Sequence, residues 1–203
     1  MKQLSFTDRE AKEILEKGSL LALPTETVYG LAVRADDPLA YERLVKVKNR
    51  RPDKPIAVMC SKNFDLEKYF LIDEGTKSVI DTLLPGPLTI LVKARENAPY
   101  QMHLGTFVAG IRIPKKQELL DFLDTLPFLI QVTSANLSGS PALTSQEEVY
   151  NTFDSMKEVE GIVSGTCESK IPTTVVSLLH GKVEIIRQGQ ITKEEIEAVY
   201  HRR

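Results

Sequence analysis

Lys46-Val-Lys-Asn-Arg-Arg-Pro-Asp-Lys54 is the stretch around which this 203-residue chain is organised. It sets five cations against one acid, Asp53, where a helical pattern ends and a strand pattern begins. Lysine and arginine give charge-assisted hydrogen bonds to phosphate oxygens, so such a cluster can hold a polyanion. The alternative is a solvated helix end whose cations complement the helix dipole. In an extended segment, the side chains of Lys48, Arg50 and Lys54 would point to the same side of the chain.

A second polar stretch, Thr133-Ser-Ala-Asn-Leu-Ser-Gly-Ser-Pro141, directly follows an apolar strand predicted at Phe128–Val132. Ser134, Asn136 and Ser138 alternate along it, and their side chains can donate and accept hydrogen bonds toward a ribose, a base or a phosphate. The alternative is an ordinary capping turn, since serine and asparagine favour turns. Taken together, the basic stretch and this loop predict two walls of a nucleotide pocket.

Outward from these two stretches, apolar runs alternate with helical patterns, which predicts a single α/β domain over residues 1–203 with a mixed sheet and helices outside it. Strands are expected at Ser19–Leu23, Leu31–Arg34, Ile56–Cys60, Leu88–Lys93, Val108–Ile113 and Phe128–Val132, with a hairpin of Thr174–Leu179 and Lys182–Arg187. Helices are expected from a capping box at Thr7–Glu10 to Gly18, from Asp37-Pro38 to about Asn49, at Asn63–Phe70, Glu74–Leu84 and Gln117–Thr125, and after capping boxes at Ser145–Glu148 and Thr192–Glu195.

The bulk composition limits the classes of function. The net charge of -2 argues against general coating of nucleic acid, so an anion site must be local. Cys60 and Cys167 are far apart and lack a CxxC partner, which fits a reduced cytoplasmic protein better than a disulfide scaffold. Residues 1–20 are charged and helical in pattern, with no apolar signal region, and no apolar run approaches the roughly 18 residues that span a membrane.

Several familiar sites are absent from the sequence. It has no GxxxxGK[ST] phosphate loop, no GxGxxG after a strand, no HExxH and no His/Cys spacing suited to zinc, so we predict no protein-held metal. A nucleophilic serine or cysteine would need a histidine base, and of the three histidines only His103 lies near a plausible site loop. A hydrolase triad is therefore disfavoured, and side chains must do the work that a phosphate loop does elsewhere.

Other polar residues adjoin the predicted strands. Arg112 lies in an apolar strand, where its planar fork would suit a ligand carboxylate, or it faces solvent on the other side of the strand. Arg187 ends the hairpin and can equally be a surface residue. Thr25 and Thr27 follow a buried strand, where ligand sites in α/β folds often lie, although turn chemistry alone explains them. We interpret Glu26, between them, as a solvated loop residue rather than a base.

Seven short motifs together resemble the YrdC-like threonylcarbamoyl-AMP synthases, in the order of that family and over about residues 10 to 195. They are Pro24-Thr-Glu-Thr-Val-Tyr-Gly-Leu31, Lys48-Asn-Arg50 with Lys54-Pro55, Pro85-Gly-Pro-Leu-Thr89, Gly110-Ile-Arg-Ile-Pro114, Thr133-Ser-Ala-Asn-Leu-Ser-Gly139, Thr173-Thr-Val-Val176 and Ile186-Arg-Gln-Gly189. The combination of KxR and SxN after PTETVYGL is specific, whereas no single motif is. One departure is Arg51, which stands where the family often has proline.

The resemblance implies a twisted mixed sheet around a basic concave cavity, and the synthesis of threonylcarbamoyl-adenylate and pyrophosphate from L-threonine, bicarbonate and ATP. It further implies a product used by partner proteins to make N6-threonylcarbamoyladenosine in tRNA, possible tRNA binding, and Mg²⁺ accompanying the ATP. Lys48 and Arg50 would be catalytic. ATP would be bound by Lys48, Arg50, Lys54, Thr133, Ser134, Asn136 and Arg187. Threonine would be bound by Thr25, Arg112 and Thr173.

Two alternatives remain open on the sequence. One is a YrdC-like paralogue that binds RNA or a nucleotide without making the adenylate. The other is carbamoyl transfer of the kind performed by the YrdC-like part of hydrogenase-maturation proteins, which carry zinc-binding and other domains that are absent here. The presence of the KxR and SxN motifs together favours the synthase. Because the extra C-terminal domain of longer relatives is missing, we expect the loop 94–107 to help cover the cavity.

Overall fold

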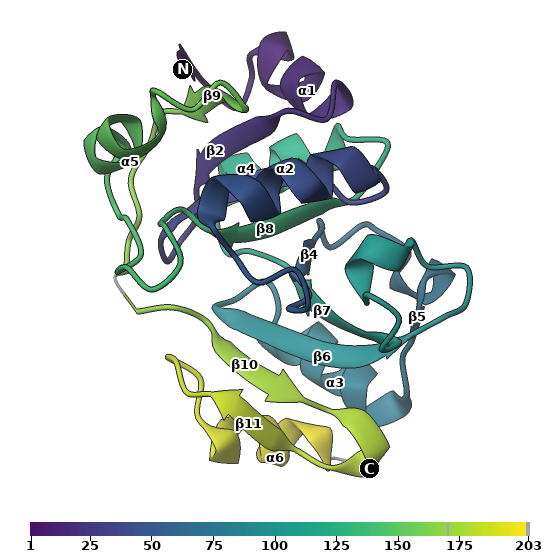
Figure 1. Ribbon diagram of the computed structural model, residues 1–203. Helices are drawn as coiled ribbons and strands as arrows, with labels where there is room; N and C mark the ends of the chain where they lie inside the picture. Colours follow the sequence, from purple (N-terminus) through teal and green to yellow (C-terminus); the bar gives the residue numbers. More distant parts are fainter. Residues whose placement is uncertain (170, 202–203) are drawn as a thin grey trace.

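One mixed sheet of eleven strands forms the centre of the fold in the computed structural model (Figure 1), which describes residues 1–169 and 171–201. Parallel and antiparallel pairs both occur in it, so the predicted mixed sheet is confirmed. In spatial order the strands are β1 (Lys2–Leu4), β9 (Val159–Val163), β2 (Leu20–Pro24), β3 (Tyr29–Arg34), β8 (Ile130–Ser134), β4 (Val58–Met59), β7 (Val108–Arg112), β6 (Leu88–Ala94), β10 (Thr174–Ser177) and β11 (Glu184–Arg187), with β5 (Phe70–Leu71) paired to β6 off this path.

In the part of the chain that the structure describes, six α-helices and three short 3₁₀ segments lie outside the sheet. In Figure 1, α2 crosses in front of β2 and β8, while α3 lies behind β6. The helices are α1 (Arg9–Glu16), α2 (Pro38–Lys48), α3 (Glu74–Leu83), α4 (Gln117–Asp124), α5 (Gln146–Phe153) and α6 (Lys193–Tyr200), and the 3₁₀ segments are η1 (Leu66–Lys68), η2 (Tyr100–Met102) and η3 (Leu179–Gly181).

Strand β2 shows why the sheet is covered on both sides. Leu20 and Ala22 pack into a core with α2, whereas Leu21 and Leu23 pack on the opposite face into a core with α1 and α4. Because alternate residues point to opposite faces, a strand covered twice is apolar without interruption. A third core lies between β6, β7, α3 and α6. These cores hold rigidly the strand ends from which the polar residues project.

Local capping signals in the sequence correctly predicted where several helices begin. The Asp37 side chain accepts hydrogen bonds from two backbone N–H groups at the start of α2, and two of the three predicted capping boxes, at Ser145 and Thr192, are formed. The predicted hairpin is also confirmed, since β10 and β11 pair antiparallel and both His180 and Gly181 adopt positive φ between them.

Other predictions were wrong. The expected helix over 63–70 is only η1 followed by β5, because Phe70 leaves the helical conformation to pair with Ala94. The capping box predicted at Thr7 is replaced by an N-cap at Asp8 that makes no side-chain capping bond. Residues 2–4 form β1 rather than helix, pairing in parallel with the equally unexpected β9. No helix among residues 1–169 and 171–201 has the length and apolar character needed to cross a bilayer.

Candidate active site

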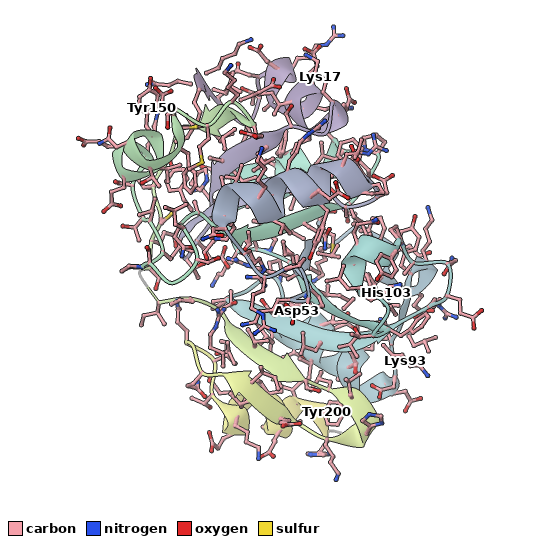
Figure 2. All side chains as sticks on the ribbon, in the orientation of Figure 1. Lys17, Asp53, Lys93, His103, Tyr150 and Tyr200 are labelled. Carbon is pink, nitrogen blue, oxygen red and sulfur yellow. The ribbon has the colours of Figure 1, made fainter. Side chains whose placement is uncertain are left out.

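A cavity of about 570 Å³ lies where β6, β7, β8 and β10 meet the loop that follows α2. Its size is typical of a site for small molecules, which fall between about 300 and 1,000 Å³. Figure 2 places Asp53 of that loop near the centre of the view. Among the described residues, the lining includes no aspartate or glutamate, and its polar members are Thr27, Arg50, Thr89, Thr106, Arg112, Thr133, Ser134, Thr173 and Arg187.

Lys48 joins the end of α2 to the polar loop after β8. It is only 2% exposed, and its ammonium donates to the backbone oxygen of Ser134, to that of Asn136 at 2.9 Å and to Asn136 Oδ1 at 3.1 Å. Burial, followed by the nearby charge of Arg50, lowers the pKa of Lys48 to about 8. Lys48 therefore lies one layer behind the cavity lining and carries a proton that is easily lost.

The expected alternation of three cations is wrong. Lys48 belongs to α2, and Asn49 ends that helix in the left-handed conformation, so the segment is not extended. Arg50 lines the cavity and is held by its own loop, donating from Nε to Lys54 O at 3.4 Å and from Nη2 to Pro55 O at 3.2 Å. Burial lowers the pKa of Arg50. Lys54 accepts a hydrogen bond from Arg50 through its backbone carbonyl, but its side chain is exposed and does not line the cavity.

The loop after β8 is both a turn and a wall of the cavity. Thr133 and Ser134 are the last residues of β8 rather than loop residues, and both line the cavity. Ser134 Oγ donates to Asn136 Oδ1 at 2.5 Å, while Asn136 Nδ2 donates to Leu137 O at 2.8 Å and to Ser140 O at 2.7 Å. Asn136 thus fixes the loop, and Ser134 presents its hydroxyl at the cavity.

Arg112 is surrounded by the residues of the loop between β2 and β3. Its Nη2 donates to Thr25 Oγ1 at 3.1 Å and to Thr27 Oγ1 at 2.9 Å, and it lies 2.9 Å from Glu26 Oε1. Arg112 lines the cavity and does not face bulk solvent, since its side chain is only 12% exposed. The interpretation of Glu26 as a solvated residue was wrong, because it is 5% exposed and paired with Arg112.

Thr173 and Arg187 form another wall. Arg187 donates from Nε and Nη2 to Thr173 O, at 3.1 and 2.9 Å, and from Nη2 to Thr173 Oγ1 at 3.0 Å. Thr89 Oγ1 lies 3.0 Å from the same hydroxyl. Burial, followed by the charge of Arg112, lowers the pKa of Arg187. Arg187 is exposed, and among the described residues its hydrogen bonds go to the neutral oxygens of Thr173, which leaves its charge to attract an anion.

Sequence reasoning missed the residue that holds two loops beside the cavity. Gln131 on β8 is fully buried, and its Nε2 donates to Ile56 O and to Gln101 O, both at 2.9 Å. These bonds join the segment after Arg50 to η2 in the loop 94–107, of which Thr106 lines the cavity. The available signal was a single amide inside the apolar run Leu129–Val132, where a buried polar group needs hydrogen-bond partners.

The described cavity contains neither a cluster of metal-binding side chains nor a histidine that could act as a base. Within residues 1–169 and 171–201, no three His, Cys, Asp or Glu side chains are grouped to hold a metal ion. His103 is buried in η2's loop, stacked on Phe107 with ring centroids 4.7 Å apart, and it is not among the lining residues. The arrangement is suited to binding phosphate and carboxylate groups in fixed positions.

The family described as "Telomere recombination" (Sua5_yciO_yrdC) matches residues 13–189. A Pyrococcus abyssi protein named threonylcarbamoyl-AMP synthase is 32% identical over 194 residues, covering 94% of this chain and 56% of its own length. The structure of P. abyssi Sua5 complexed with L-threonine superposes with a TM-score of 0.87 at 29% identity, over 98% of this chain and 60% of that one. Escherichia coli YciO has the same fold, with a TM-score of 0.84 at 23% identity over 96% and 97% of the two chains. The chain thus spans little more than half the length of the P. abyssi relatives.

Proposed function

The chain belongs to the Sua5/YciO/YrdC family, and from that membership and the cavity we propose that it is an L-threonylcarbamoyladenylate synthase. In the proposed reaction, L-threonine, bicarbonate and ATP give threonylcarbamoyl-adenylate and pyrophosphate. The observation that carries the proposal is a cavity whose described lining has three arginines and six hydroxyl side chains but no carboxylate. Such a cavity complements the charges of a triphosphate and an amino-acid carboxylate.

The proposed chemistry needs positioning more than a protein nucleophile. The threonine amine adds to CO₂ derived from bicarbonate, forming a carbamate and releasing a proton. A carbamate oxygen then attacks the α-phosphorus of ATP, and the bond from that phosphorus to the pyrophosphate oxygen breaks. Holding the reacting groups in line and neutralising charge that develops on the phosphates can supply most of the acceleration.

The nucleotide would lie against Arg50, Thr133 and Ser134. Arg50 presents a guanidinium to the phosphates, and Ser134 and Thr133 present hydroxyls from the end of β8. Behind Ser134, Lys48 supplies positive charge, and a phosphate oxygen could take the place of one of the three oxygens that its ammonium now contacts. Asn136 would act by fixing the loop, and Lys54 would reach the phosphates only from the exposed outer side of its own loop.

The amino acid would lie at the end of the cavity formed by Arg112 and Thr173. Arg112 would receive the threonine carboxylate, with Thr25 holding its guanidinium from behind. Thr173, which is hydrogen-bonded to Arg187, would line the cavity beside the substrate carboxylate with its hydroxyl group. Arg187 lies near Arg112 and would share the charge of the carboxylate or of the α-phosphate. Support comes from the relative of the same fold that has been solved with L-threonine.

Magnesium would enter with the substrate. The described lining has no carboxylate to hold a divalent ion, whereas Mg²⁺ commonly binds through substrate phosphates and retained water. The proposed product would be consumed by proteins that transfer the threonylcarbamoyl group to tRNA in the cytoplasm. A local basic cavity could also contact tRNA, although the chain's net charge of -2 gives no general affinity for nucleic acid.

The test is pyrophosphate release from ATP and bicarbonate, with and without L-threonine. Threonine-dependent release supports the synthase, and Arg50→Ala should abolish it while the circular dichroism and melting temperature stay as in the wild type. Lys54→Ala is the matched control, since it removes an exposed cation of the same loop and should reduce turnover far less. Release that ignores threonine, or an Arg50→Ala variant with full activity, would reject the proposal. ATP or RNA binding without release would favour the binding paralogue.

A further inference from the structure

The loop between β2 and β3 is buried, although loops normally run over the surface. Strand pairing ends at Pro24 and Tyr29, and all four residues of Thr25–Val28 are less than one-tenth exposed. Thr25 Oγ1 satisfies this buried backbone by donating to the carbonyl of the last loop residue at 2.7 Å and accepting from Thr27 N at 3.1 Å. From outside, Ser169 N donates to Glu26 O at 3.0 Å. The loop is thus built into the wall behind the cavity.

Glu26 places a buried carboxylate against Arg112. Its Oε1 lies 2.9 Å from Arg112 Nη2, yet neither carboxylate oxygen has a hydrogen-bond partner among the described residues. The two N–H groups of Nη2 are taken by the hydroxyls of Thr25 and Thr27, at 3.1 and 2.9 Å. Glu26 therefore acts on Arg112 through its charge. Glu26 does not line the cavity, whereas Arg112 does.

The charge balance of the cavity depends on this carboxylate. Arg50, Arg112 and Arg187 line one space, and the charge of Arg112 is among the causes that lower the pKa of Arg187. Within residues 1–169 and 171–201, Glu26 is the only carboxylate within 4 Å of any of these three arginines. Arg112 Nε is buried, and its N–H has no hydrogen-bond partner among the described residues. A buried, unpaired N–H is costly unless a ligand or water accepts from it.

We propose that Glu26 is a positioning residue for the amino-acid substrate: its buried carboxylate holds the Arg112 guanidinium against Thr25 and Thr27, which aims the remaining N–H groups at the substrate carboxylate. This inference rests on the proposed function, because it takes the substrate of Arg112 to be an amino acid. Without the carboxylate, repulsion from Arg187 and Arg50 would let the guanidinium turn out of this position. The contact between Arg112 and the substrate carboxylate would then be weakened, whereas the nucleotide contacts at Ser134 would remain.

The test compares Glu26→Gln with the wild type, because glutamine keeps the shape of the side chain and removes its charge. We expect the dissociation constant for L-threonine, measured by calorimetry, to rise about tenfold and KM for L-threonine to rise with it. KM for ATP should change less than about twofold. Glu26→Asp keeps the charge on a shorter side chain, and its KM for L-threonine should lie between the values for the wild type and Glu26→Gln. The control is Glu160→Gln, the same change at a carboxylate of β9 that accepts a hydrogen bond from Ser19 Oγ and does not line the cavity, and it should leave both KM values unchanged.

A second measurement follows Arg112 directly. Nitrogen-15 NMR of arginine Nε–H groups, with the Arg112 signal assigned from Arg112→Lys, should show faster hydrogen exchange at Arg112 in Glu26→Gln than in the wild type. A general loss of stability would not single out that resonance. If Glu26→Gln does not fold, Glu26→Asp decides, and an unchanged KM for L-threonine in it overturns the proposal.

The two measurements separate this inference from the proposed function. If the wild type turns over L-threonine and Glu26→Gln has the same KM and the same Arg112 exchange, the positioning role is wrong and the synthase stands. If the wild type neither binds nor turns over L-threonine, the proposed function fails and the role of Glu26 as a positioning residue for that amino acid is overturned with it. In that case the NMR result only tells whether the ion pair holds Arg112 for another ligand.

Discussion

ATP binding should weaken as pH rises from 7 to 9, because the ammonium of Lys48 has a pKa of about 8. A bound triphosphate would keep that ammonium charged, so the complex holds a proton that the free protein loses over this range. With a pKa of 8 in the free protein and one well above 9 in the complex, linkage gives a dissociation constant about tenfold larger at pH 9 than at pH 7. Most of the change falls above pH 8.

Other groups near the site should not produce this dependence. The arginines of the cavity stay charged throughout the range. Burial raises the pKa of Tyr41 above its ordinary value and also that of Cys167, so both stay mainly neutral at pH 8. The assay is calorimetric titration with MgATP at several pH values, in two buffers of different ionisation enthalpy, which counts the protons taken up on binding. Uptake should approach about one proton near pH 9 in the wild type.

Lys48→Met is the control, because it removes the only group to which the dependence is assigned. Its affinity for ATP should be weak and nearly constant between pH 7 and 9. If the wild-type dissociation constant is flat over this range, or if Lys48→Met keeps the wild-type slope, then the charge of Lys48 does not contribute to ATP binding and the reasoning fails.

Further predictions follow from individual contacts. The pKa of Lys48 is lowered in the fold, so the folded protein binds fewer protons than the unfolded chain between about pH 8 and 10.5. The free energy of unfolding, measured in urea, should therefore rise with pH over this range in the wild type, and rise less in Lys48→Met. Gln131→Met removes both of its bonds to loop carbonyls and should cost about 1–3 kcal/mol in the same assay; no loss would mean that these bonds do not hold the loops. Gly189→Ala would bring a Cβ to 2.3 Å from a backbone nitrogen of β10, so we expect a loss of about 1–3 kcal/mol, and wild-type stability would contradict this packing. Arg112→Lys loses the planar fork and should raise the dissociation constant for L-threonine about tenfold or more with little change for ATP, whereas an equal effect on both would contradict a separate amino-acid end.

The sequence predicts those features of the fold that local chemistry determines. Asp37 before Pro38 starts α2, and the capping boxes at Ser145 and Thr192 start α5 and α6, because each signal acts within one helical turn. Strand β1 has only three residues, and it is a strand because it pairs with β9, more than 150 positions away. A periodicity of so few residues carries no signal, so pairing at this distance is not readable from the chain.

The candidate site divides in the same way. The motifs predicted which side chains gather, and Arg50, Ser134, Arg112 and Thr173 do meet at one cavity. The motifs did not predict how far each side chain is buried. Glu26 looked like a solvated residue of a polar loop, but it is buried because the segment after β9, distant in sequence, covers that loop. Burial decides the role of Glu26, because a buried carboxylate interacts more strongly with the Arg112 guanidinium than a solvated one would.

The most direct test of the central claim is mass detection of the product formed from ATP, L-threonine and bicarbonate. With ¹³C-bicarbonate, we expect threonylcarbamoyl-adenylate that is heavier by the mass of one neutron, and pyrophosphate in equal amount. The same product should be missing when L-threonine is omitted and in the Arg50→Ala variant. ATP bound without any adenylate that contains the labelled carbon would contradict the proposed synthase activity.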